Sequence, residues 1–210
     1  MRLKKKTRRF IITVLVIFLV ILLGFVIFKK LNSESGNHVK EVKVLDKLDD
    51  YGYSLKENKT STYKTMFNEL KKILNEEKVD EEAYAKKIAE MFVYDFYSLD
   101  DKAAKTDIGG VEFVYGAILE NFLQNAQNTY YKYVESNIYN NRNQLLPIVK
   151  DIEVTNIEQK AFGYGSEIDE EAYFVDVTWD YTNTEFSSYQ KEANLVFIHD
   201  GKKLSLVELQ

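Results

Sequence analysis

Aspartate and tyrosine are the residue types in this sequence that could carry out acid–base chemistry. The chain has 15 tyrosines, and Asp176 and Asp180 lie on a segment in which alternate residues are apolar. A positioned carboxylate can act as a general base, and a tyrosine hydroxyl can donate a proton. The alternation puts both aspartates on the strand side opposite Trp179, which is the solvent side of a one-sided sheet. We therefore predict that they are surface carboxylates and that the chain has no catalytic residue.

Metal ligands are also sparse. His38 and His199 are far apart in the sequence, both are expected to be exposed, and no H-E-x-x-H pair occurs. The acidic run Glu167, Asp169, Glu170 and Glu171 lacks the D-x-[DN]-x-[DN]-G spacing of a calcium-binding loop. A solvated turn is the simpler interpretation of this run. The sequence predicts no metal site.

Motifs for nucleotide binding and for nucleophilic catalysis are absent. Gly109-Gly110 belongs to neither G-x-G-x-x-G nor G-x-x-x-x-G-K, so the pair predicts a plain turn. No G-x-S-x-G nucleophile turn occurs. The chain contains no cysteine, which excludes thiol chemistry and disulfide bonds. We therefore predict a protein that is not an enzyme and that binds no cofactor.

Helical periodicity dominates the middle of the chain. Apolar residues recur at intervals of three and four from Ser61 to Leu74 and again from Asp80 to Leu99. The second stretch opens with three acidic residues, which suit a helix amino terminus. The spacing resumes after the Gly-Gly turn and predicts a third, longer helix over residues 111–133. The sequence therefore predicts three amphipathic helices.

After Pro147 the apolar period falls to two. Alternation over residues 172–181 predicts a long strand with one aromatic side that faces the core. Asp200-Gly201 predicts a tight hairpin between the last two strands. Three further strands are predicted within residues 149–162, 191–199 and 203–209. Because helices precede strands without alternation, the predicted fold class is α+β, with three helices followed by an antiparallel sheet of about four strands.

Six aromatic residues are candidates for a pocket or a contact surface. They lie on the predicted third helix and the predicted long strand, whose apolar sides we expect to face each other: Phe122, Tyr130, Tyr133, Tyr173, Trp179 and Tyr181. On the helix this side also includes Ile118 and Ala126. Aromatic residues at regular spacing commonly fill a core, so core packing is the competing interpretation.

Residues 10–28 are 19 consecutive uncharged residues, with Thr13 as the one polar side chain. As a helix they would extend about 28 Å, which matches the hydrocarbon thickness of a bilayer. A cleaved signal peptide usually has a shorter apolar region that ends in small residues, and a buried helix of a soluble domain carries more polar residues. Both stay open as alternatives, but the segment favours an uncleaved transmembrane helix.

Basic residues around this segment predict its orientation. Only Lys29 and Lys30 follow it closely, whereas six precede it: Arg2, Lys4, Lys5, Lys6, Arg8 and Arg9. Basic residues are retained on the cytoplasmic side of membranes. We therefore predict a single-pass protein of the cell membrane with a cytoplasmic amino terminus and an extracellular carboxy-terminal domain.

The resulting domain scheme has four parts: a cytoplasmic basic tail (1–9), the transmembrane helix (10–28), a linker and juxtamembrane segment (29–59) and an extracytoplasmic α+β domain (60–210). Beyond residue 30, 20 basic residues stand against 33 acidic ones, a net charge of −13. Nucleic acid is therefore not an expected partner, because phosphate binding requires clustered Lys and Arg. Abundant Lys, Asn, Ile and Tyr with a single proline is typical of low-GC Gram-positive bacteria.

The order of elements over residues 60–210 resembles that of the nuclear-transport-factor-2-like superfamily. The shared features are two amphipathic helices, a long third helix entered through Gly109-Gly110, and an antiparallel meander. The resemblance implies a cone whose sheet wraps the long helix, and some relatives are isomerases or dehydratases with an Asp base and Tyr donors. With its basic tail and apolar segment, the chain also resembles bitopic assembly subunits of conjugation and type IV secretion machines. Both resemblances are architectural.

Three functions are compatible with these features. We favour a non-catalytic, membrane-anchored interaction or assembly domain in an envelope or transfer machine, with the membrane and other envelope proteins as partners. A small-ligand-binding ectodomain with an aromatic-lined cone pocket is the alternative, and an isomerase- or dehydratase-like enzyme is the third hypothesis. An acidic, aromatic-rich domain without catalytic spacing favours the first.

Overall fold

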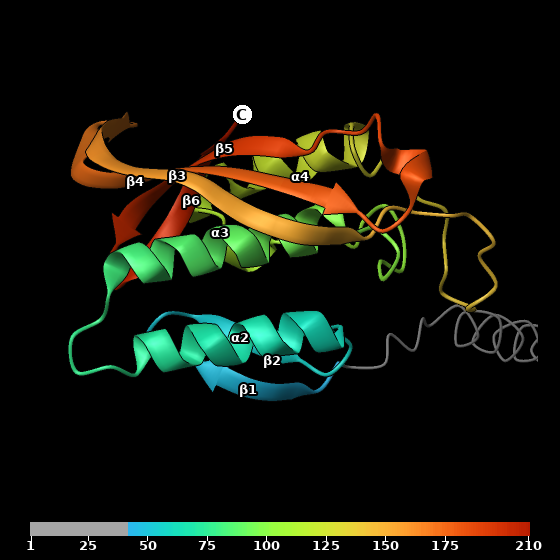
Figure 1. The fold of residues 1–210 in the computed structure, drawn as a ribbon, viewed down its shortest axis with the longest axis horizontal. Coiled ribbons are helices and arrows are strands. Elements are labelled where there is room, and N and C mark those ends of the chain that lie inside the picture. Colours follow the sequence, from blue (N-terminus) through green and yellow to red (C-terminus); the bar gives the residue numbers. More distant parts are fainter. Residues whose placement is uncertain (1–41) are drawn as a thin grey trace, which may run out of the picture. The chain divides into compact units, whose positions relative to one another are not determined.

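A computed structural model describes residues 42–210, which form one compact unit (Figure 1). The unit begins with an antiparallel hairpin and continues with three α-helices and a four-stranded sheet. The hairpin strands and the α-helices are β1 (Val44–Leu48), β2 (Tyr53–Lys56), α2 (Ser61–Leu74), α3 (Glu81–Tyr97) and α4 (Leu119–Asn128). The sheet strands are β3 (Val149–Tyr164), β4 (Glu167–Tyr181), β5 (Glu192–Asp200) and β6 (Lys203–Leu209). Single 3-10 turns occur at Val111–Phe113, Gly116–Ile118 and Thr184–Phe186.

Side-chain caps start the first two helices. The hydroxyl oxygen of Thr60 accepts a hydrogen bond from the Tyr63 N–H (3.2 Å), and the Asp80 carboxylate accepts one from the Ala83 N–H (3.0 Å). Each cap satisfies a backbone donor that the first turn of a helix leaves free. Both starts agree with the boundaries predicted from the sequence.

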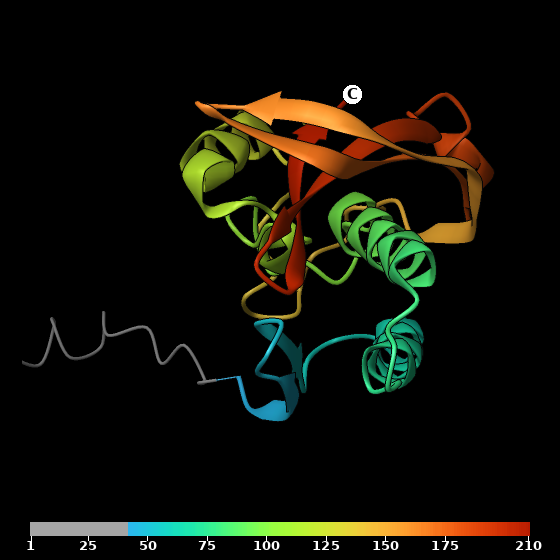
Figure 2. The same cartoon turned by 90° about the vertical axis from the view of Figure 1, so that its left-hand side faces the viewer.

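Helix α3 is the central helix of the unit. It packs against α2 on one side and against β3 and β4 on the other, as the two views in Figures 1 and 2 show. From Met91 to Tyr97 every side chain of α3 is buried. A helical segment that is buried on all sides belongs in a core, so the second half of α3 lies in the hydrophobic interior of this domain.

The sheet is antiparallel throughout, in the order β3-β4-β5-β6. On β4 the alternation is the predicted one, because Tyr173, Val175, Val177, Trp179 and Tyr181 are all buried. The predicted hairpin also forms: Asp200 pairs with Lys203, and Gly201 has a φ of 67°, in the region that glycine adopts without steric cost.

The predicted third helix over residues 111–133 is wrong. Only Leu119–Asn128 is α-helical, and two 3-10 turns precede it. The Tyr115 N–H donates to the Leu206 carbonyl (2.8 Å), and Val114 forms a parallel bridge with Leu206. The apolar residues of this segment thus pack beside β6 in a non-helical conformation, although their spacing matched a helix.

The predicted partner of the β4 apolar side is correct in part: the Tyr130 hydroxyl lies 3.3 Å from the Tyr181 hydroxyl, but the helix that packs on β4 is α3. Trp179 packs on Tyr97 of α3, with ring centroids 4.4 Å apart. The Phe122 ring packs on Phe92 and Phe96, at 6.1 and 5.3 Å. Helix α3 therefore lies where the sequence analysis expected the third helix.

As a whole, the predicted fold class is contradicted, because it opened with a membrane-spanning helix. Among residues 42–210, no helix has the length and apolarity that a membrane crossing requires. The segment 10–28, to which the prediction referred, lies outside the described residues. What the structure retains is the α+β composition, with three α-helices ahead of a four-stranded antiparallel sheet.

Residues 42–59, expected to be linker, belong to the compact unit, where Leu48, Tyr53 and Leu55 are buried.

Candidate functional site

The six candidate aromatic residues do not form one site. Phe122 and Tyr130 line the same pocket, and Trp179 and Tyr181 are buried in the core beside it. Tyr173 is buried on β4 next to His199, with ring centroids 6.0 Å apart. Tyr133 is exposed on the loop after α4. Of the six candidates, two therefore line a pocket, three are core residues and one is exposed.

The pocket that contains Phe122 and Tyr130 has a volume of about 480 Å³, and we call it the α4 pocket. It is formed by the carboxyl end of α3, one side of α4, Gln190 and the end of the chain: Phe96, Tyr97, Ile118, Asn121, Phe122, Asn125, Ala126, Thr129, Tyr130, Gln190 and residues 206–210. Its size falls within the range of small-molecule sites. Two carboxamides that the sequence analysis missed, Asn121 and Asn125, stand one helical turn apart at its edge.

Tyrosine hydroxyls are hydrogen-bonded to one another beside the α4 pocket. The Tyr130 hydroxyl donates to the Tyr97 carbonyl (3.1 Å) and lies 3.3 Å from the Tyr181 hydroxyl, which donates to the Gln190 carbonyl (2.8 Å). Burial, and then the neighbouring Tyr181, raise the pKa of Tyr130 well above its ordinary value. The hydroxyl therefore stays neutral and is suited to hydrogen bonding rather than to proton abstraction.

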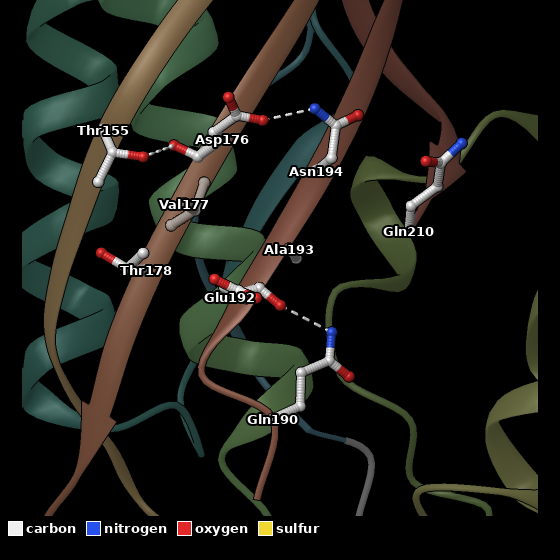
Figure 3. A pocket seen from close by; sticks show the side chains of 9 residues that line it. All are labelled: Thr155, Asp176, Val177, Thr178, Gln190, Glu192, Ala193, Asn194 and Gln210. Atoms are coloured by element: carbon white, nitrogen blue, oxygen red, sulfur yellow. Dashed lines mark hydrogen bonds between the residues drawn. The ribbon is translucent and has the colours of Figure 1, made fainter.

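A second pocket lies on the outer face of the sheet, and most of the residues that line it are polar (Figure 3). Its volume is about 570 Å³. Figure 3 shows Asp176 of β4 and Asn194 of β5 pointing toward each other, and the Asn194 amide donates to the carboxylate at 2.5 Å. The Asn156 amide donates to the same carboxylate at 3.2 Å. Asp176 is half-buried on the outer face. Its carboxylate already accepts hydrogen bonds from two side-chain amides.

The structure brings together a histidine and two carboxylates that the sequence analysis treated separately. Asp169 accepts hydrogen bonds from the backbone N–H and the ring Nδ1 of His199, at 2.7 and 2.9 Å. The Glu81 carboxylate lies 3.6 Å from His199 Nε2. Burial, followed by the charges of Glu81 and Glu82, raises the pKa of the adjacent Tyr173 to about 12.

This group corrects the expectation that His199 is exposed and the acidic run is only a solvated turn. Burial alone raises the pKa of Asp169, but the backbone N–H groups of His199 and Glu171 outweigh it and lower that pKa. Within residues 42–210, no three His, Asp or Glu side chains lie close enough together to hold a metal ion. The group of Asp169, His199 and Glu81 joins β4 and β5 to the start of α3.

The most strongly perturbed carboxylate is buried in an ion cluster, which we call the Asp95 cluster and define as Lys59, Asp95, Asp101 and Lys102. Lys59 and Lys102 approach the Asp95 carboxylate at 2.6 and 3.1 Å, and the Gly110 N–H donates to it at 2.8 Å. Asp101 pairs with Lys102 at 2.6 Å. Burial alone raises the pKa of Asp95, but Lys102 and Lys59 outweigh it and lower the pKa to about 2.

A perturbed pKa can mark a functional site, but the Asp95 cluster is closed. Asp95 is 4 % exposed and Lys102 is 3 % exposed. The Gly-Gly turn packs directly against α3 beside the cluster. A Cβ on Gly109 would lie 1.9 Å from the Asp95 carbonyl oxygen, so a larger residue does not fit there. The cluster therefore fixes α3 to the turn at residues 109–110 and is structural.

Comparison with known proteins adds no assignment: no protein-family model, curated protein or solved structure matches the chain. The resemblance to the nuclear-transport-factor-2-like superfamily therefore stays a prediction.

Proposed function

We propose that residues 42–210 are a non-catalytic interaction domain that binds another protein of the cell envelope through the loop at residues 130–147. The observation that carries the proposal is an ordered loop with large apolar side chains on its surface. Four of them are Tyr133 (75 % exposed), Ile138 (59 %), Tyr139 (85 %) and Leu145 (49 %). Exposed aromatic residues are enriched at protein interfaces.

The backbone of the 130–147 loop, the gold segment in Figure 1, is held by two polar side chains. The Arg142 guanidinium donates to the carbonyls of Asp100 (2.6 Å), Lys102 (2.8 Å) and Glu135 (3.2 Å). The Gln144 side chain accepts from the Glu135 N–H (2.9 Å) and donates to the Tyr133 carbonyl (2.8 Å). A surface that is already ordered loses less conformational entropy when a partner binds.

The base of the same loop is anchored in the core. The buried Tyr131 hydroxyl donates to the Phe96 carbonyl (2.7 Å) and accepts from the Gly109 N–H (3.0 Å). Tyr131 is thus a core residue, whereas Tyr133 is exposed and belongs to the contact surface that we propose. The order of elements, helices before a meander, supports the proposed likeness to assembly subunits.

In-cell photo-crosslinking tests the loop. A photoreactive amino acid at position 139 of the full chain is expected to give a discrete protein adduct, whereas one at the exposed Glu153 of β3 should not. Replacing Tyr133 and Ile138 by Ser should reduce the adduct about tenfold, because truncating an interface aromatic commonly costs more than 1 kcal/mol. The same variants should unfold within about 0.5 kcal/mol of the parent, since both side chains are exposed.

Three results would count against the proposal. They are equal crosslinking from positions 139 and 153, adducts with lipid alone, and an adduct that the Ser substitutions leave unchanged. An adduct between two copies of the chain would replace the proposed envelope protein by self-association.

We also propose that this domain lies outside the cell membrane. The support is the excess of basic residues before the segment 10–28 over those after it. A reporter that works only outside the cell is expected to be active when fused after Gln210, and protease added to intact, wall-stripped cells should remove the domain. A reporter that works only in the cytoplasm is the matched control at the same position, and its activity would overturn the location.

A further inference from the structure

The α4 pocket combines packed aromatic rings with an uncharged polar rim. The Phe96 ring lies 5.3 Å from the Phe122 ring and 5.9 Å from the Tyr130 ring, and it stacks on the latter with an interplanar angle of 21°. Phe96 is itself buried and also contacts Tyr97 and Tyr131. The rings are therefore held in place before any ligand arrives, which reduces the entropic cost of binding.

Carboxamides supply most of the polar rim. Asn121 and Asn125 project from the same side of α4, because residues four apart are neighbours on a helix. Both are exposed, and within residues 42–210 neither side-chain amide bonds to another residue. Gln190 and Gln210 contribute two further carboxamides to the lining. Each carboxamide offers both donors and an acceptor.

The charge of the lining limits the class of ligand. No lysine, arginine or histidine lines the pocket, so an anionic ligand would find no counter-charge. Glu208 is the one lining residue with a charged side chain, and its carboxylate already accepts a hydrogen bond from the Gln210 amide. Burial raises the pKa of Tyr130, which keeps its hydroxyl neutral. The polar groups thus fit uncharged hydroxyl and amide groups, and the rings fit an apolar face.

We propose that the α4 pocket binds an uncharged N-acetylated sugar, a ligand whose hydroxyl and amide groups match the carboxamide rim and whose C–H face matches the half-buried rings of Phe122 and Tyr130, which the buried Phe96 ring supports from behind. This site shares Tyr130 with the loop at residues 130–147 that we propose for protein binding, but Tyr133, Ile138, Tyr139 and Leu145 do not line it. It also needs no catalytic group, because the residues of the pocket orient a ligand without acid–base chemistry.

Titration of isotope-labelled residues 42–210 tests the proposal, since these residues form one compact unit with its own core. The neutral probe is the disaccharide of N-acetylglucosamine. Two matched disaccharide probes are its deacetylated form, which is cationic at neutral pH, and N-acetylglucosaminyl-N-acetylmuramic acid, which is anionic. We expect the neutral probe to shift the side-chain amide signals of Asn121 and Asn125 and the backbone signal of Phe122, and to bind at least tenfold more tightly than either charged probe.

Substitutions on α4 separate specific from adventitious binding. Asn121→Ala combined with Asn125→Ala should weaken binding of the neutral disaccharide by about 10- to 30-fold, as expected for the loss of two neutral hydrogen bonds. Gln124→Ala removes a carboxamide from the same helix outside the pocket lining and should leave binding unchanged. All three side chains are exposed, so folding should be preserved.

Each other outcome overturns the proposal. An absence of shifts at about 20 times the concentration that saturates a general sugar-binding control protein would exclude a site of useful affinity. Tighter binding of the cationic probe would mean that Glu208 and the ring faces select a cation. Equal weakening by Gln124→Ala would mean that the sugar binds the surface of α4 without a defined site.

Discussion

Asp95→Asn is expected to lower the free energy of unfolding of residues 42–210 by about 3–5 kcal/mol, which is the usual cost of removing one partner from a buried ion pair. The substitution keeps the shape of the side chain and leaves an oxygen that can accept from the Gly110 N–H. It removes the charge that faces Lys59 and the buried Lys102. Urea unfolding followed by circular dichroism at neutral pH measures the loss.

Asp180→Asn is the matched control. Asp180 pairs with Lys191 at 2.5 Å, but both side chains are at least one-third exposed. Exposed pairs contribute little, so this variant should stay within about 1 kcal/mol of the parent. If the two variants unfolded at the same urea concentration, the Asp95 cluster would have no special role in stability.

The pH dependence provides a second readout of the same prediction. The pKa of Asp95 is about 2 in the folded domain, below the value of about 3.9 for an unfolded aspartate. A depressed carboxylate pKa stabilises the fold above the unfolded pKa, and the contribution is lost as the pH falls through the folded pKa. We expect the parent to lose about 2–3 kcal/mol from this group between about pH 5 and pH 1. The stability difference between the parent and Asp95→Asn should therefore shrink as the pH falls.

One residue of the Asp95 cluster was visible in the sequence, although the cluster was not. Asp95 lies within the apolar stripe of the predicted second helix, where a carboxylate would be buried. A buried charge requires a partner, so its position alone indicates an ion pair. Lys59 and Lys102 could not be chosen from among the lysines of the chain, because they come from two loops whose approach depends on the tertiary fold.

The strand prediction was more accurate than the third-helix prediction for a physical reason. Alternation over residues 173–181 identified the buried side of β4 correctly, because a period of two has no competing interpretation over nine residues. The spacing of Val111, Val114, Tyr115 and Ile118 was ambiguous, since 3-10 turns that pack beside a strand also bury residues at intervals of three and four. The contact between His199 and Asp169 depends on the β4–β5 register, which the sequence left open.

The α4 pocket was predictable in part. Phe122 and Tyr130 were chosen as aromatic candidates, and they do share a pocket. Asn121 and Asn125 were overlooked, although their spacing on a predicted helix puts them on one side together with Phe122. The opposite wall comes from residues 206–210. No periodicity relates that wall to α4, so the pocket itself requires the structure.

Trp179→Ala is expected to cost about 3–5 kcal/mol of unfolding free energy, because it removes a buried ring and leaves a cavity. Trp179 is 3 % exposed and packs on Tyr97 of α3. It is the one tryptophan of the chain, so its fluorescence reports this contact without interference. Emission should be blue-shifted and protected from quencher in the folded domain. Emission typical of a solvent-exposed indole would mean that the register of β4 is inverted.

A double-mutant cycle distinguishes the observed packing from the one predicted on the sequence. Leucine is used at each position so that the double variants stay folded. Trp179→Leu and Tyr97→Leu should couple by about 0.5–1.5 kcal/mol, the range for an aromatic pair in contact. Trp179→Leu and Phe122→Leu should be additive within about 0.5 kcal/mol, because the Phe122 ring packs on Phe92 and Phe96 instead. Coupling to Phe122 without coupling to Tyr97 would restore α4 as the partner of β4 and would remove α3 from the centre of the domain.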